Sequence, residues 1–168
     1  MSSLRPFRKP PRASLCWPNG IYYISSLSTH GAEEHMDKAK LFALASDAAR
    51  ASYSPYSKFR VGAALLCADG TVFTGTNVEN RSFGLTICAE RSALVAAIGA
   101  GKREFEGIAI STPDADYPVS PCGACRQVLS EFLKPSAPVV FGSKAGTLVE
   151  TTIGDLLPND ALHELGSR

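Results

Sequence analysis

The spacing of apolar residues over positions 36–76 predicts a helix followed by a β-hairpin. The stretch 36–53 repeats them at helical spacing, and Pro55 ends it because proline cannot continue a helix. The run 61–67 is almost continuously apolar, as in a buried strand. Asp69-Gly70 then predicts a two-residue hairpin turn, and 71–76 the returning strand. The helical stripe comprises Leu41, Phe42, Ala45, Ala48 and Ala49.

The rest of the pattern alternates helices with strands. The predicted helices span 88–100 and 123–133, and the predicted strands span 107–111, 138–141 and 147–151. The helix side chains expected to point inward are Leu94, Val95, Ile98, Val128, Leu129 and Phe132. Thr152 and Asp155 have the spacing of a helix start for a short final turn. This order predicts a single α/β domain with a three-layer α/β/α arrangement and a five-stranded mixed sheet.

Residues 1–35 differ from this pattern because prolines interrupt them throughout. We expect a disordered or non-native N-terminal extension over 1–35, ahead of a domain that spans 36–168. A protein start at Met36 is the alternative, because the helical pattern begins there. A transit peptide is a third interpretation, since the stretch up to residue 32 contains Arg and Ser without acidic residues, although it is not amphipathic.

Composition and charge exclude several classes of protein. A chain of 168 residues with 45% hydrophobic residues is long enough for one domain with a buried core. Residues 36–168 carry a net charge of −1, because they hold 13 of the 17 basic and 14 of the 16 acidic residues. Nucleic acid is therefore not an expected partner. No apolar run approaches the roughly 18 residues that a membrane span needs.

Three cysteines and one glutamate form a pattern suited to catalytic zinc. Cys88-Ala89-Glu90 is followed by a Cys-x-x-Cys at Cys122 and Cys125. Three protein ligands leave the fourth tetrahedral position of zinc open for water, whereas structural zinc has four. Glu90 lies close enough to handle the proton of that water without binding the metal. We therefore expect one Zn²⁺ per subunit, with Glu90 as general acid and base, a role worth roughly 10²–10⁴ in rate.

The predicted helices favour thiolate ligands and supply nearby positive charge. Cys88 and Cys122 both begin predicted helices, where free N–H groups and the helix dipole stabilise a thiolate. Three thiolates on Zn²⁺ leave a net charge of −1, which weakens the metal as a Lewis acid. We expect Arg91 and Arg126, each next to a site residue, to donate hydrogen bonds to sulfur and offset this charge.

The remaining cysteines and histidines do not complete a four-ligand structural site. Cys16 and Cys67 have no partner spacing, and we expect a tail residue and a core thiol respectively. The histidines lie in the tails, at His30, His35 and His163. Five cysteines without regular spacing do not indicate a secreted disulfide framework, and thiolate ligands fit a reducing cytoplasm better. A non-catalytic, zinc-stabilised binding module stays open as an alternative that would not need Glu90.

Four motifs in matching order resemble the small homotetrameric cytidine deaminases over about residues 36–165. The resemblance implies zinc-dependent deamination of free cytidine and 2′-deoxycytidine in pyrimidine salvage, with Cys88, Cys122 and Cys125 as ligands and Glu90 as proton donor. It also implies a homotetramer whose sites lie at subunit interfaces. The motifs are Tyr53-Ser54-Pro55-Tyr56-Ser57-Lys58-Phe59-Arg60-Val61-Gly62-Ala63-Ala64, Gly75-Thr76-Asn77-Val78-Glu79-Asn80, Thr86-Ile87-Cys88-Ala89-Glu90-Arg91-Ser92-Ala93 and Ser120-Pro121-Cys122-Gly123-Ala124-Cys125-Arg126-Gln127-Val128-Leu129.

The same resemblance implies the residues that bind the nucleoside. Phe59 would pack against the pyrimidine, Asn77 and Glu79 would bind the ribose 3′-hydroxyl, and the Ala89 main chain with Glu90 would read the base edge. The residues alone agree, since Asn77 and Glu79 alternate at a strand end and so point to one side. An amide and a carboxylate suit sugar hydroxyls and repel phosphate, which favours a free nucleoside. Without the resemblance, Phe59 would be read as a core residue.

Three positions depart from the family pattern. Phe83 stands where many relatives have Tyr, Arg81 where a small residue is usual, and Ala161 where an aromatic often reaches a neighbouring subunit's site. These departures affect substrate affinity and subunit contacts rather than the chemistry. They keep open a deaminase of a cytosine nucleoside antibiotic, of the blasticidin-S type.

Overall fold

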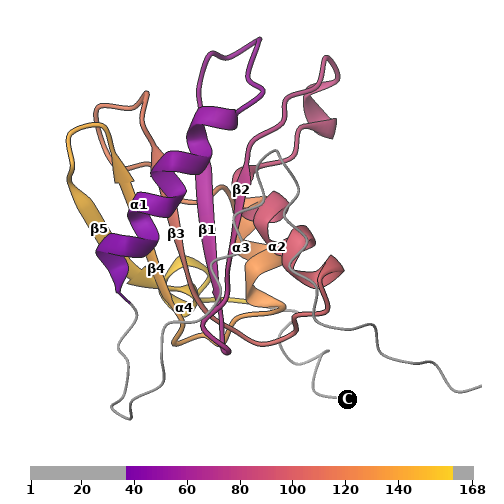
Figure 1. The fold of residues 1–168 in the computed structure, drawn as a ribbon, viewed down its shortest axis with the longest axis vertical. Coiled ribbons are helices and arrows are strands. Elements are labelled where there is room, and N and C mark those ends of the chain that lie inside the picture. Colours follow the sequence, from indigo (N-terminus) through magenta and orange to yellow (C-terminus); the bar gives the residue numbers. More distant parts are fainter. Residues whose placement is uncertain (1–36, 161–168) are drawn as a thin grey trace, which may run out of the picture.

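A five-stranded mixed sheet with strand order β2-β1-β3-β4-β5 forms the centre of the fold (Figure 1). The structure is a computed structural model that describes residues 37–160. The predictions for 1–35, Met36, Ala161, Cys16 and the three histidines lie outside the described residues. The helices are α1 Lys38–Ala48, η1 Ala49–Ala51, η2 Phe83–Leu85, α2 Ala89–Gly99, α3 Gly123–Ser130 and α4 Ile153–Leu156. The strands are β1 Gly62–Cys67, β2 Val72–Thr76, β3 Phe105–Thr112, β4 Pro138–Ser143 and β5 Leu148–Thr152.

The sheet separates two hydrophobic cores, which makes the three predicted layers. α1 covers one face, where Leu41 and Ala45 pack with Ala64, Ala109 and Val140. α2 and α3 cover the opposite face, where the larger core contains residues of every strand except β5. Only β3 and β4 pair in parallel among the described strands, and the other pairs are antiparallel. The α/β fold with a five-stranded mixed sheet is therefore confirmed.

Two glycines let the helices lie directly against the strands. A Cβ atom at Gly75 of β2 would lie 2.3 Å from the backbone nitrogen of Ala93 and 2.4 Å from the backbone oxygen of Ala89. A Cβ atom at Gly62 of β1 would lie 2.0 Å from the backbone oxygen of Ala45 in α1. Real Cβ atoms do not approach backbone this closely, so each glycine fixes how near its helix can lie to the sheet.

The structure corrects three local predictions. The β1–β2 turn has three residues rather than two, because Cys67 pairs with Thr71 and Gly70 takes a φ of +79°. Val95 is 69% exposed, whereas Leu94 beside it in α2 is buried. Phe132 is also exposed, because α3 ends at Ser130 and the changed path turns Leu133 inward instead.

The start of α4 agrees with its prediction. Thr152 and Asp155 form a capping box, in which each side chain accepts a hydrogen bond from the other residue's backbone N–H. Within residues 37–160, no helix combines the length and the hydrophobicity that crossing a bilayer requires.

Candidate metal centre

The starts of α2 and α3 bring three thiols to one place. Cys88 and Cys122 are the N-cap residues of these helices, and Cys125 lies in the first turn of α3. The three Sγ atoms lie within 4.8 Å of one another, and those of Cys88 and Cys122 are 3.9 Å apart. Tetrahedral zinc with Zn–S bonds of about 2.3 Å requires sulfurs roughly 3.8 Å apart. The donor set and its spacing therefore fit zinc.

The site differs in burial from one ligand to the next. Cys125 is buried, Cys88 is partly exposed and Cys122 is exposed, so the cluster opens to solvent on one side. Neither N-cap side chain accepts a hydrogen bond from its own helix, which leaves both sulfurs available as ligands. Backbone N–H groups at both helix starts add positive potential there.

Hydrogen bonding favours a thiolate at Cys88. A hydrogen bond from Cys125, supported by further bonds from Arg91 and Cys122, lowers the pKa of Cys88 to about 5. The same bond with Cys88, together with burial, raises the pKa of Cys125. These opposite shifts favour the thiolate at Cys88 rather than at Cys125, and binding of a divalent cation would release the proton of the remaining thiol.

Glu90 is a buried carboxyl in the first turn of α2, 4% exposed. Burial is the main cause that raises its pKa, and the negative charge of Cys88 raises it further. A carboxyl with a raised pKa holds a proton more readily near neutral pH, which suits a group that must both accept and donate one. Ala89, beside it, is fully buried at the helix start.

The two arginines have different partners. The Nη2 atom of Arg91 donates to Cys88 Sγ at 3.5 Å and to the Thr86 carbonyl at 2.9 Å, as the sequence predicts for a group that offsets thiolate charge. Arg126 instead donates to the Pro121 carbonyl, to Ser120 Oγ and to the Leu156 carbonyl. The predicted hydrogen bond of Arg126 to sulfur is therefore wrong. Its side chain instead connects α4 to the segment before Cys122 through these hydrogen bonds.

The residues expected to bind substrate lie around the loop that precedes β1. Phe59 is half-buried and belongs to neither hydrophobic core, which argues against its reading as a core residue. Asn77 is 7% exposed, and Glu79 is partly exposed two residues later. Both side chains bind this loop, so their predicted position on one side of the chain agrees with the contacts.

Several residues of this region escape sequence reasoning. Ser57 contacts Glu79, and Arg60 forms a two-pronged ion pair with Asp114, with Nη2 2.5 Å from Oδ1. Ser57 belongs to a motif that resembles the family, but nothing in the motif names its partner. Cys67, by contrast, is the buried thiol that the sequence predicts, and burial raises its pKa to about 11.

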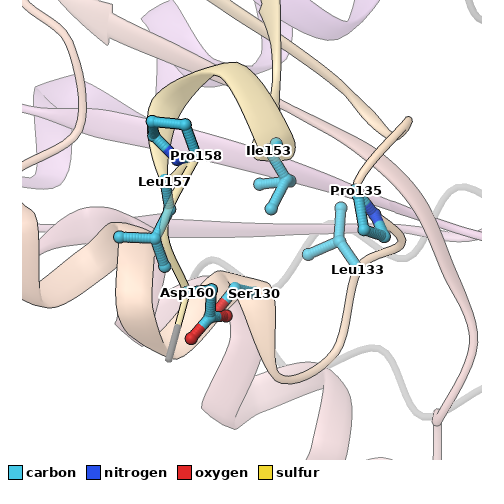
Figure 2. Close-up of a pocket in the computed structure, with 8 residues that line it drawn as sticks. Ser130, Leu133, Pro135, Ile153, Leu157, Pro158 and Asp160 are labelled. Carbon is cyan, nitrogen blue, oxygen red and sulfur yellow. The ribbon is translucent and has the colours of Figure 1, made fainter. Parts of the chain in front are cut away.

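A cavity of about 190 Å³ lies apart from the thiol cluster, between the end of α3 and α4 (Figure 2). None of the three thiols and none of the residues expected to bind substrate lines it. We therefore do not assign it to the metal centre. Its lining includes Ser130, Leu133, Pro135, Ile153, Leu157 and Asp160.

Known proteins resemble this chain over most of the described residues. A family model described as "Cytidine and deoxycytidylate deaminase zinc-binding region" matches residues 35–142. A cytidine deaminase of Sporosarcina psychrophila is 49% identical over 123 residues, which cover 73% of this chain and 90% of the relative. A blasticidin-S deaminase of Bacillus cereus is 34% identical over 109 residues, covering 61% of this chain and 76% of the relative.

A solved structure has the same fold at similar identity. The crystal structure of cytidine deaminase from Burkholderia pseudomallei is 48% identical, with a TM-score of 0.71, and the match covers 74% of this chain and 98% of that one. The family match, this likeness and the three-thiol cluster all agree. The chain therefore belongs to the family defined by the cytidine and deoxycytidylate deaminase zinc-binding region.

Proposed function

We propose that this chain is a zinc-dependent cytidine deaminase. It adds water to cytidine or 2′-deoxycytidine and releases ammonia, which leaves uridine or 2′-deoxyuridine. The observation that carries this proposal is a cluster of three thiols with a buried carboxyl, Glu90, in the turn that follows Cys88. A relative and a solved structure named cytidine deaminase, at 49% and 48% identity, support this substrate class.

Cys88, Cys122 and Cys125 are the zinc ligands in this proposal. Bound zinc supplies a Lewis acid that makes water a nucleophile near neutral pH. With zinc held there, Glu90 would take one proton from the attacking water and give it to the ring nitrogen of the base. It would then move the remaining proton of the hydroxyl added at C4 to the amino group, which leaves as ammonia. Its raised pKa supports this role, because the group must be protonated for part of the cycle.

Arg91 and the start of α2 assist these steps. Through its bond to Cys88 Sγ, Arg91 withdraws negative charge from the ligand set, which keeps the zinc a stronger Lewis acid. The Ala89 N–H, at the first position of α2, has no hydrogen-bond acceptor within the helix. It reads the edge of the base together with Glu90.

The sugar and base are bound by the residues around the loop before β1. Phe59 packs against the pyrimidine, and Asn77 with Glu79 binds the 3′-hydroxyl. The carboxylate of Glu79 repels a phosphate, which favours nucleosides over nucleotides and polynucleotides. Its pKa is held below the ordinary value, first by the Ser57 hydroxyl, so the group is charged at neutral pH.

The test is the loss of cytidine absorbance when purified protein is added, with and without a zinc chelator. We expect deamination that the chelator abolishes and added zinc restores. A folded, zinc-loaded protein without activity on cytidine and 2′-deoxycytidine would refute the proposal. Arg81, exposed on the loop after Glu79, departs from the family pattern, and we therefore retain a deaminase of the blasticidin-S type as the alternative function. Steady-state rates on cytidine and on blasticidin S in the same assay distinguish the two functions.

We further propose a homotetramer with sites at subunit interfaces, working in the cytoplasm in pyrimidine salvage. Exposed apolar side chains gather in the loops next to the site and on α2, and burial between subunits accounts for them. Light scattering after size-exclusion chromatography measures the mass directly. A Val95→Glu variant is expected to dissociate the assembly, and a wild-type monomer would contradict this proposal. The exposed side chains are Tyr53, Tyr56, Val78, Phe83, Leu85, Ile87 and Val95.

A further inference from the structure

The loop between η1 and β1 is fastened by two side chains that follow β2. Asn77 Oδ1 accepts hydrogen bonds from the Val61 backbone at 2.9 Å and from Ser52 Oγ at 2.5 Å. Its Nδ2 atom donates to the Phe59 carbonyl at 2.9 Å. The Asn77 amide therefore fixes both sides of Arg60 in the chain. Among the described residues, this amide bonds the loop through both its oxygen and its nitrogen, and the second hydrogen of Nδ2 can still donate to the 3′-hydroxyl.

Glu79 fastens the earlier part of the same loop. Its Oε2 atom accepts from the backbone N–H groups of Tyr56 at 2.9 Å and Ser57 at 3.2 Å. Its Oε1 atom accepts from the hydroxyl of Ser57. A carboxylate oxygen has two lone pairs, so Oε1 keeps the capacity to accept one more hydroxyl. The oxygen available to a sugar is thus the one that Ser57 holds in place.

The Ser57 hydroxyl also contacts the other end of the loop. It accepts a hydrogen bond from the Phe59 backbone N–H at 3.0 Å while it donates to Glu79. Lys58, between Ser57 and Phe59, has a backbone φ of +59°, which few residues other than glycine adopt without an energetic cost. The chain turns sharply here, with the Lys58 N–H bonded to the Ser54 carbonyl at 3.1 Å. One hydroxyl therefore joins the Glu79 carboxylate to the backbone that carries the Phe59 ring.

We propose that Ser57 is a positioning residue that sets the spacing between the sugar end and the base end of the nucleoside site. This inference rests on the proposed function, in which Glu79 takes the 3′-hydroxyl and Phe59 the pyrimidine. Without the Ser57 hydroxyl, Oε1 of Glu79 loses its only partner among the described residues, and the Phe59 N–H loses its acceptor. The two subsites then lose the side-chain link that joins them directly, although Glu79 keeps its bonds to the Tyr56 and Ser57 backbone and no atom that contacts the substrate has been removed.

The experiment compares Ser57→Ala with the wild type on 2′-deoxycytidine and on 2′,3′-dideoxycytidine, which lacks the 3′-hydroxyl. The wild type should prefer the substrate with the 3′-hydroxyl, and Ser57→Ala should reduce this preference in kcat/KM roughly tenfold, the scale of a hydrogen bond to a charged group. The loss should lie mainly in KM, because the zinc ligands and Glu90 are untouched. Binding of the product 2′-deoxyuridine, measured by calorimetry, should weaken in parallel.

Two matched variants complete the test. Ser57→Thr keeps the hydroxyl and should restore the preference, whereas Ser54→Ala removes a hydroxyl of the same loop that contacts only Ser52 among the described residues and should leave the preference unchanged. An unchanged ratio of the two substrates in Ser57→Ala overturns the inference while the proposed function stands. A folded, zinc-loaded wild type inactive on cytidine as well as on both of these substrates refutes the proposed function and this inference with it, whereas activity on cytidine alone overturns only the inference.

Discussion

Replacing Gly75 by alanine should separate the zinc ligands by moving α2. The added Cβ atom would lie 2.3 Å from the Ala93 nitrogen and 2.4 Å from the Ala89 oxygen, both backbone atoms of α2. An ordinary contact needs about 3.4 Å, so the helix must move by roughly 1 Å. Such overpacking typically costs about 1–3 kcal/mol. For a chain of this size, that corresponds to a melting temperature lower by roughly 2–12 °C.

The same displacement acts on the metal centre because Cys88 is the N-cap residue of α2. Zinc–ligand distances tolerate changes of only about 0.2 Å, and the two other ligands belong to α3, which the substitution does not touch. Gly75→Ala should therefore release zinc faster than the wild type. Gly62→Ala is the matched control, since its Cβ atom would lie 2.0 Å from the Ala45 oxygen and so displace α1, which carries no ligand.

The assay measures zinc release to a chromophoric chelator and the melting temperature on the same samples. Both variants should melt earlier, but only Gly75→Ala should release zinc faster at a temperature where both remain folded. Equal zinc release from the two variants would show that the position of α2 against β2 does not set the ligand geometry, and the reasoning would fail.

Three further predictions concern single side chains. Glu90→Gln should keep its zinc, measured by metal analysis, and lose roughly 10²–10⁴ in kcat, and near-normal turnover would remove this carboxyl from the mechanism. Arg126→Gln should release zinc faster while the pH optimum of activity stays unchanged, because it loosens the segment before Cys122 rather than the charge on sulfur. Arg60 lowers the pKa of Asp114 to about 2 from a usual 3.8, so this carboxylate stabilises the fold above pH 4 and loses that effect as the pH falls towards 2. The stability difference between the wild type and Asp114→Asn, measured by urea unfolding, should therefore shrink across that window, and a difference that is constant with pH would contradict it.

The order of the helices and strands and the positions of the thiols can be predicted from the sequence, because both depend on residues close together in the chain. Helix starts are marked by short-range spacing, so the positions of Cys88 and Cys122 at the starts of their helices follow from the sequence alone. Hydrophobic spacing also locates each strand to within two residues or so. What it cannot locate is the face of a helix that is apolar on several sides, and the prediction for Val95 is wrong for that reason.

The contacts around the nucleoside loop lie beyond sequence reasoning. Asn77 and Glu79 bind residues 16–25 positions away in the chain, and such pairings follow from the β1–β2 register rather than from local propensity. The observed partners of Arg126 could not be predicted from its neighbours in the sequence either. Its position beside Cys125 predicts a bond to sulfur, whereas its side chain extends to the Leu156 carbonyl of α4, which only the folded chain brings near.

The metal ligands are positioned by two helices packed on a sheet, whereas the loops that precede them, 77–87 and 113–121, hold no ligand. The architecture therefore separates the residues that hold the metal, at the starts of α2 and α3, from the loops beside them. Grafting a different 77–87 segment onto this scaffold should alter which cytosine derivatives enter while zinc retention stays at the level of the parent protein. For protein engineers, the β2–α2 connection is the natural place to redesign selectivity, whereas the β3–α3 connection carries Ser120 and Pro121, which Arg126 holds beside the ligand Cys122.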